Sequence, residues 1–210
     1  MAKATNNGSS AVLDEPAGIK LRRLERVVHE IPIRGTAPLI VNRWSEKAKQ
    51  MMLEAQQTKA RPKKDPKDPV ANFEASKYHL EDGRDGFPAT AFKASIVHAG
   101  RLFDGITQVQ LKQTVVVIGI GPEQLVPLEY GSCSMREDTP RNASGVADLR
   151  YRAQYNDWSA TLQVRSIAGS FDIESLFALV DAAGIGGVGE WRPTSPKSAT
   201  GTFGTFEVVG

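Results

Sequence analysis

Apolar and polar residues alternate with a period of two in two stretches, and this pattern predicts β-strands. In residues 27–34 the odd-numbered positions carry the apolar side chains. His29 lies among them, where we expect a packed histidine and not a catalytic one. Pro32 has no N–H to give to a neighbouring strand, which indicates an edge position or a bulge. In residues 158–167, Ala, Leu and Val recur at every second position, so a strand is predicted there too.

Three further strands are predicted from runs of apolar and β-branched residues. The runs 114–120 and 124–130 are separated by Gly and Pro residues within 119–122, which favours a hairpin. Residues 203–209, which contain two Phe and two Val, predict a last strand.

Apolar residues with a helical period predict two well-formed helices with one core-facing stripe each. The first begins within residues 86–93, and the second runs from about 172 to 183. Their stripes are formed by Phe92, Ile96, Ala99, Gly100 and Phe103, and by Ile173, Leu176, Phe177 and Val180. Two shorter helices are predicted at about 46–57, capped by Ser45, and from Asp68 to about residue 78, with Pro69 at the first helical position.

Without the inserted segments, these elements follow the order strand, helix, strand, strand, helix, strand. This order predicts an α+β fold of the ferredoxin-like βαββαβ type, which the RNA-recognition-motif fold shares. We expect one domain over residues 19–210, with insertions at about 43–80 and 132–156. Residues 1–18 are small and polar and are expected to form a disordered tail.

Composition narrows the function classes. The chain has 210 residues, a formal net charge of +2 and one cysteine. A single cysteine excludes a disulfide framework and a multi-cysteine metal site, and it fits a cytoplasmic protein. No run of about 18 apolar residues is present, so no membrane span is expected. We find no ligand cluster and no valid phosphate-loop context, and we therefore expect no metal and no cofactor.

A glycine-rich stretch, residues 184–207, contains the spacing G-x-G-x-x-G at Gly184, Gly186 and Gly189. A dinucleotide fingerprint needs a strand before the glycines and a helix after them, and here the order is reversed. The stretch is therefore interpreted either as a helix C-cap with a flexible connection, or as a loop whose bare backbone lets another chain lie close. Trp191 and Arg192 would give such a chain a stacking face and a phosphate partner.

Two other segments are locally basic. Residues 43–67 hold eight Lys and Arg side chains against three Asp and Glu. This segment is either a solvated loop or a mobile arm over phosphates, and the sequence leaves both open. Residues 132–152 carry four arginines with Tyr151 among them, which is typical of a nucleic-acid surface but also of an exposed hairpin with cross-strand Arg and Tyr partners.

Three stretches resemble the RAMP superfamily of CRISPR-associated RNA-binding proteins. They are residues 33–39, residues 86–101 and the glycine-rich residues 184–206. The middle one is similar to that superfamily's lysine motif and the helix that follows it. Pro88, Thr90, Phe92, Lys93 and Arg101 are the matching positions, while Ala89, Thr90, Ala91 and Ala94 replace the motif's serines and glycines. The chain looks like a phage or mobile-element relative of the CRISPR backbone subunits.

This resemblance implies a non-catalytic protein that oligomerises along single-stranded RNA or DNA, with other effector-complex subunits as further partners. Residues 132–152 would then be the thumb that separates groups of nucleotides. Three alternatives stay open: an endoribonuclease, a phage strand-annealing protein, and a protein-binding mimic of a CRISPR subunit. No histidine lies in a catalytic spacing, and Asp138 is the one acidic residue that suggests cleavage.

The candidate nucleic-acid-binding residues combine the basic segments, the lysine helix and the glycine-rich loop. Lys93 lies in the first turn of its helix, where it opposes the helix dipole and would suit a bound anion. The candidates are Arg43, Lys47, Lys93, Arg101, Arg136, Arg141, Arg150, Tyr151, Arg152, Gly186, Gly187, Gly189, Trp191 and Arg192.

Overall fold

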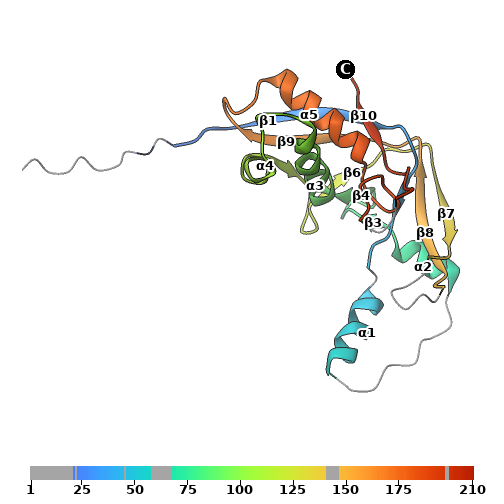
Figure 1. The fold of residues 1–210 in the computed structure, drawn as a ribbon. Helices are drawn as coiled ribbons and strands as arrows, with labels where there is room; N and C mark the ends of the chain where they lie inside the picture. The colour runs from blue at the N-terminus through green and yellow to red at the C-terminus, as the bar shows by residue number, and fades with distance from the viewer. Residues whose placement is uncertain (1–20, 22, 45, 58–67, 141–146, 197–198) are drawn as a thin grey trace, which may run out of the picture.

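A computed structural model describes residues 21, 23–44, 46–57, 68–140, 147–196 and 199–210 (Figure 1). The predicted tail, the cap Ser45, most of the basic arm and the candidate Arg141 lie outside the described residues. Lys47 lies within a helix, but its side chain is also outside the description.

The centre of the molecule is a four-stranded antiparallel sheet with the strand order β10-β1-β9-β5. Strands β1 and β9 pair over nine residue pairs, from Arg26 with Ile167 to Arg34 with Ser159. The strands are β1 (Arg26–Gly35), β5 (Val116–Ile118), β9 (Ser159–Ile167) and β10 (Phe206–Val208).

Two helices connect these strands and cover one face of the sheet. Helix α3 (Ala89–Ala99) lies between β1 and β5 in the sequence, and α5 (Ile173–Gly186) lies between β9 and β10. Numbered along this core, the strand order is 4-1-3-2, which is the ferredoxin-like arrangement. The predicted α+β class and βαββαβ core are therefore confirmed.

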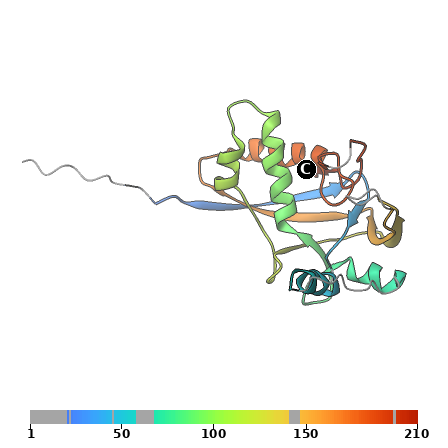
Figure 2. The same cartoon turned by 60° about the horizontal axis from the view of Figure 1, so that its bottom comes forward.

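The main core lies between this sheet and the two helices, as the crossing of α3 over β1 and β9 shows (Figure 2). Ile31 and Leu162 from the sheet are fully buried, and so is Phe92 from α3. The Phe92 and Phe206 rings meet edge to face at 6.1 Å. The predicted stripe on α3 is confirmed through Gly100, but Phe103 lies beyond the helix and is 39% exposed.

Pro32 indicated an edge position or a bulge. Strand β1 lies at an edge of the sheet over only part of its length. Over residues 33–35 it lies between β9 and β10. The Pro32 carbonyl accepts a hydrogen bond from the Val209 N–H at 2.9 Å, so the backbone of Pro32 faces the side of β10. The β10 ladder ends at Val208. Pro32, which has no N–H to donate, therefore lies one residue beyond the end of the β1–β10 ladder.

Two small antiparallel sheets extend the core. One has the order β2-β8-β7, and the other has the order β3-β4-β6. The first sheet contains β2 (Leu39–Val41), β7 (Ser132–Asp138) and β8 (Arg150–Asn156). The second contains β3 (Tyr78–His79), β4 (Asp85–Pro88) and β6 (Leu125–Pro127). The exposed hairpin suggested for residues 132–152 is thus the β7–β8 pair. Strand β2 pairs with the free edge of β8.

The prediction that residues 114–120 and 124–130 form a hairpin is wrong, because the two strands lie in different sheets. Strand β5 pairs with β9, whereas β6 pairs with β4, and a bridge between Ile120 and Leu125 joins the two segments. The first segment also starts later than predicted, because residue 114 ends helix α4 (Gln108–Thr114). A capping box of Thr107 and Gln110 starts this helix, and its pattern was missed.

The predicted short helices are present as α1 (Glu46–Gln57) and α2 (Pro69–Ala75). Asp68 caps α2 by accepting the Ala71 N–H at 3.1 Å. Helix α1 stands away from the sheets in Figure 1. A 3-10 turn, η1 (Gly100–Leu102), follows α3. Among the described residues, no helix is both long and apolar enough to span a bilayer.

Candidate nucleic-acid interface

The glycine-rich loop and the start of α3, which are far apart in the sequence, face each other across a groove. We call it the helix–loop groove, and its volume is about 400 Å³. From α3 and the residue before it come Pro88, Thr90, Ala91, Ala94, Ser95 and His98. The loop supplies Gly187, Val188, Gly189, Glu190, Arg192 and Thr194, and Asn42, Tyr78 and Phe87 complete the lining.

The N-terminal end of α3 opens into this groove. The Ala89 N–H is bonded to the Gln124 carbonyl at 2.9 Å. Thr90 and Ala91, which follow, line the groove. The first turn of a helix has N–H groups without helical acceptors, and its partial positive charge attracts anions. The groove therefore has an electropositive end that needs no charged side chain.

Backbone N–H groups of the loop add to this character. Gly189, Trp191 and Arg192 have no acceptor for their N–H groups within the described part of the chain. The loop itself is held in place by its own polar contacts. Arg192 donates to the Gly189 carbonyl at 2.7 Å, and the Thr194 hydroxyl donates to the Gly186 carbonyl at 2.8 Å.

The loop begins as a helix C-cap, which confirms that interpretation of the glycines. Gly187 has a φ of +67° and donates its N–H to the Ala183 carbonyl at 3.1 Å. Ser95 of α3 fastens the cap, because its hydroxyl lies 2.7 Å from the Ala183 carbonyl and 3.1 Å from the Gly187 carbonyl. Gly186 is the last helical residue.

The bare backbone of the loop packs closely against other segments of the same chain. A Cβ on Gly189 would lie 2.6 Å from the Ile40 carbonyl oxygen of β2. A Cβ on Gly204 would overlap the Val188 carbonyl oxygen. Close packing of residues 187–192 with β2 and with residues 201–204 explains these glycines.

Trp191 does not offer the open stacking face that was expected. Its residue is half-buried, and its indole N–H is buried with no acceptor among the described residues. Its φ of +56° is unusual for a residue with a side chain and is strained by about 1–2 kcal/mol. Trp191 is therefore partly buried and does not line the groove, while Arg192 beside it does.

Lys93 and Arg101, the cations of the lysine motif, do not line the helix–loop groove. The Lys93 ammonium donates to the Lys112 carbonyl at 3.1 Å, close to the C-terminal end of α4. A cation is favourable at that end of a helix dipole, so this contact accounts for Lys93 without a ligand. Arg101 is exposed on η1.

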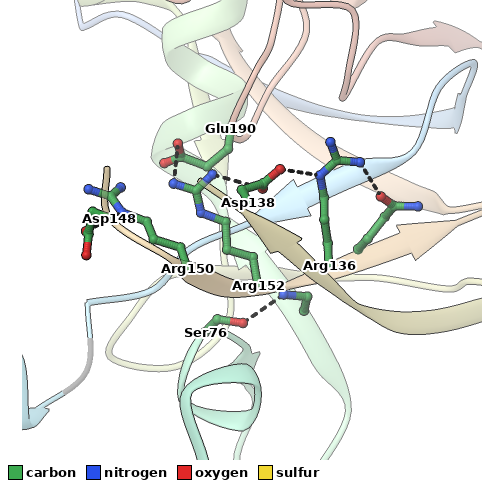
Figure 3. Close-up of polar contacts among 9 residues, drawn as sticks. Ser76, Arg136, Asp138, Asp148, Arg150, Arg152 and Glu190 are labelled. Atoms are coloured by element: carbon green, nitrogen blue, oxygen red, sulfur yellow. Dashed lines mark hydrogen bonds and ion pairs between the residues drawn. The ribbon is translucent and has the colours of Figure 1, made fainter. Parts of the chain in front are cut away.

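Three arginines of the β7–β8 hairpin lie side by side but in different environments (Figure 3). Arg152 is 1% exposed, and its guanidinium lies between two carboxylates, 3.3 Å from Asp138 and 3.6 Å from Glu190. Arg136 donates to the other oxygen of Asp138 at 2.8 Å. Arg150 pairs with Asp148 at 3.1 Å and stays partly exposed.

Arg152 is therefore a buried structural arginine and not the surface phosphate contact that was predicted. Burial lowers the pKa of its guanidinium, and the Glu190 carboxylate opposes that shift. The Arg152 Nε atom is buried without a partner among the described residues. Since Glu190 belongs to the glycine-rich loop, the Arg152–Glu190 pair also fixes that loop to the hairpin.

Arg136 is held by contacts within the protein as well. Its Nη1 donates to the Gln154 side chain at 3.2 Å, and its guanidinium lies 4.8 Å from the centre of the Phe203 ring. This stacking joins the hairpin to residues 201–204. Sequence reasoning placed Arg and aromatic residues together correctly, but the partner is Phe203 of the same chain.

A second hollow, of about 330 Å³, adjoins the first between the end of β2, α2 and β8. We call it the hairpin pocket. It brings together the predicted Arg43, Arg150 and Tyr151, and Asn42 lines both hollows. Its lining is Asn42, Arg43, Trp44, Asn72, Ala75, Ser76, Asp148, Leu149, Arg150 and Tyr151.

Arg43 connects the two hollows. Its guanidinium lies 5.8 Å from the centre of the Tyr78 ring and pairs with Glu123. Burial raises the pKa of Tyr78, and the Arg43 charge opposes this shift. Tyr78 lines the helix–loop groove, so Arg43 lies where the groove continues into the hairpin pocket.

Sequence reasoning missed Trp44, Tyr78 and Asn42. The Arg43–Trp44 pair repeats the Trp191–Arg192 combination that had drawn attention to the loop, and this signal was available. Tyr78 had been assigned to the end of a helix. Its place in β3, which turns the ring toward Arg43, depends on pairing with β4 and is not visible in the local sequence.

The histidines and carboxylates give no metal centre among the described residues, where no cluster of three such ligands occurs. His79 Nδ1 lies 2.7 Å from Asp85, and the Tyr130 hydroxyl donates to Asp85 at 2.8 Å. The hydrogen bond to Asp85 raises the pKa of Tyr130 to about 12. His98 lines the helix–loop groove.

The open face of the central sheet differs from the face that RNA-recognition motifs use. That platform depends on aromatic side chains on the sheet. The residues that turn away from the helices in these four fully described strands include no aromatic one. They are Arg26, Val28, Glu30, Pro32 and Arg34 of β1, Ser159, Thr161, Gln163, Arg165 and Ile167 of β9, Val116 and Ile118 of β5, and Glu207 of β10.

No protein-family model matches this sequence, and no curated protein matches it significantly. Among solved structures, the chain is similar to Cmr6 from Pyrococcus furiosus, at 12% sequence identity and a TM-score of 0.43. The alignment covers 89% of this chain and 100% of that one. A likeness this distant carries no argument about function, and the fold class rests on the strand order and pairing described above.

Proposed function

We propose that this chain is a non-catalytic protein that binds single-stranded nucleic acid in the helix–loop groove. One observation carries the proposal: the N-terminal end of α3 and two loop residues whose N–H groups have no acceptor among the described residues, Gly189 and Arg192, line the same groove. Both elements attract anions through the backbone, without regard to base sequence. A phosphate backbone is an extended anion that suits such a groove.

Side chains along the same path support a strand more than a small anion. Arg192 lines the groove, and Arg43 and Arg150 line the adjoining hairpin pocket. A path with cations at intervals and aromatic side chains between them is typical of single-strand binding. The net charge of the chain is only +2, so this local arrangement and not a general basic character would give the affinity.

The proposal extends to assembly along the strand. Several copies would lie side by side on one strand, with other effector-complex subunits as further partners, as the sequence resemblance implies. Light scattering on the complex with strands of increasing length tests this extension, because the number of bound copies then rises with length. One copy per strand at every length would contradict it.

Replacing Thr90 with glutamate tests the groove directly. Thr90 is exposed at the second position of α3 and lines the groove. A carboxylate there suits the helix dipole, by about 0.3–1 kcal/mol, but it repels phosphate. We expect Thr90→Glu to keep the fold and to weaken binding of a labelled single strand about tenfold, as measured by fluorescence anisotropy at low salt.

Thr161→Glu is the matched control, because it makes the same charge change on the open face of the sheet, where Thr161 is exposed. It should bind almost as the wild type does. Wild-type affinity should also fall steeply between about 50 and 200 mM salt, because phosphate contacts release counterions. Equal effects of the two substitutions, or an affinity independent of salt, would contradict the proposed groove. A strand cleaved during incubation with magnesium would contradict a non-catalytic role.

A further inference from the structure

The hairpin pocket has a chemistry that the helix–loop groove lacks. The pocket combines the exposed Trp44 ring with two guanidinium groups and the amides of Asn42 and Asn72, whereas the groove has one arginine and shares only Asn42 with the pocket. Phosphate binding needs only the groups of the groove. The combination in the pocket is what protein sites use to hold an unstacked nucleobase.

Trp44 gives the pocket its aromatic face. The side chain is 56% exposed, although tryptophan is among the residues most buried on average. Trp44 has no hydrogen-bond or ring partner within the described part of the chain. Trp44 lines the pocket and is more than half exposed, so a base can stack on its indole ring, which contributes about 1–3 kcal/mol per base.

Asn42 and Asn72 supply hydrogen-bonding groups next to this face. Both line the pocket, and neither side-chain amide has a partner among the described residues. Each amide presents a donor and an acceptor side by side. This pair matches the N6 amino group and N7 atom of adenine, which asparagine binds with two hydrogen bonds.

Ser76 makes the pocket a built feature of the fold. Its buried hydroxyl accepts the Ala153 N–H of β8 at 2.8 Å, as Figure 3 shows, and its carbonyl accepts the Arg43 N–H at 2.9 Å. One serine of the segment after α2 thus fixes both the hairpin and the residue before Trp44. The walls of the pocket are therefore positioned relative to one another.

The two arginines of the pocket can exchange their carboxylate partners for a ligand phosphate at a low cost in free energy. Arg43 pairs with Glu123, and Arg150 pairs with Asp148 at 3.1 Å. Both pairs are at least partly open to solvent, with about a third of each arginine side chain exposed. Such pairs contribute about 0–1 kcal/mol, so a phosphate next to the pocketed base can replace the carboxylate.

We infer that the hairpin pocket takes one base of the bound strand out of its stack. The base stacks on Trp44, an asparagine amide reads its edge, and Arg43 or Arg150 holds a flanking phosphate. Adenine is the preferred base. This inference rests on the proposed function, because the strand must first lie in the helix–loop groove. It then enters the pocket past Asn42, which lines both hollows.

The test compares oligo-adenine with oligo-uracil strands, or the corresponding DNA strands, on the wild type and on single variants. Trp44→Ala should weaken oligo-adenine binding about tenfold, and Trp44→Phe should restore most of it, because phenylalanine also stacks. Asn72→Ala should reduce the preference for adenine over uracil. Phe103→Ala is the control, since this aromatic residue is also exposed but lies on a different hollow.

Tryptophan fluorescence gives a second readout. The chain has three tryptophans, of which Trp158 is fully buried and Trp191 is half-buried. Quenching by an added adenine strand should therefore come mainly from Trp44 and be largely lost in Trp44→Phe.

The outcomes separate this inference from the proposed function. Binding that Thr90→Glu weakens, but that responds neither to base identity nor to Trp44→Ala, overturns the base pocket and leaves the groove intact. No binding of any strand by the wild type overturns both.

Discussion

Replacing Arg152 with methionine is expected to lower the free energy of unfolding by about 3–5 kcal/mol. The Arg152 side chain is buried between the carboxylates of Asp138 and Glu190. Asp138 is itself 8% exposed, so losing one of its two arginine partners leaves a buried charge partly unpaired. Methionine fills most of the volume, and the loss therefore measures charge pairing and not a cavity. Urea unfolding of the two proteins gives the difference.

Arg150→Met is the matched control in the same strand. Arg150 pairs with Asp148 near the surface, where such pairs contribute about 0–1 kcal/mol. Adding Asp138→Asn to Arg152→Met should recover part of the lost stability, because the unpaired charge is then removed. Equal small losses for Arg152→Met and Arg150→Met would show that the hairpin does not depend on the buried network.

Replacing Gly204 with alanine is expected to destabilise the protein by about 2–5 kcal/mol. Gly204 has a φ of +68°, which costs a residue with a side chain about 1–2 kcal/mol. In addition, the new Cβ would overlap the Val188 carbonyl oxygen. The backbone of the glycine-rich loop would have to move away from residues 201–204. Urea unfolding measures the loss, and strand binding should fall with it because the loop lines the groove.

Gly169→Ala separates the two contributions. Gly169 has a similar φ of +75°, but nothing lies within 4 Å of a Cβ placed on it. This control therefore carries only the backbone strain, and strand binding should remain unchanged. If the two alanine variants are equally stable, then residues 201–204 do not press against the loop as described.

The main fold was predictable because its signals are local. The alternation in β9 places Leu162 and Val164 in the core, and the stripe on α3 buries Phe92 and Ile96. Asp68 and Pro69 mark the start of α2 by capping and by a fixed φ. Each pattern depends on residues a few positions apart, so it can be recognised before the chain is folded.

The small sheets were not predictable in the same way. Strands β2, β3 and β4 have two to four residues, and their identity depends on partners far along the chain. The run 124–130 resembled the second half of a hairpin, but strand β6 within it pairs with β4 instead. Local composition indicates that a segment is extended, and it does not indicate which strand it joins.

The sequence pointed to several residues that line the two hollows, but not to the arrangement of their charges. Arg192 and Arg43 line the two hollows, and their phosphate contacts stay a prediction. Arg152 has the same residue type and the same neighbours in sequence, yet it is buried against Asp138 and Glu190. A charge run shows how many cations a surface can offer, but the partner that neutralises each one comes from another part of the fold.

Ultraviolet cross-linking of a bound single strand, followed by mass spectrometry, tests the central claim most directly, since it locates the strand on the protein. The account predicts cross-links to peptides that contain Trp44, Tyr78 and the loop residues 187–194, because these line the two adjoining hollows. Thr90→Glu should reduce all of them together. Cross-links confined to the open face of the central sheet, around Thr161 and Gln163, would contradict the account.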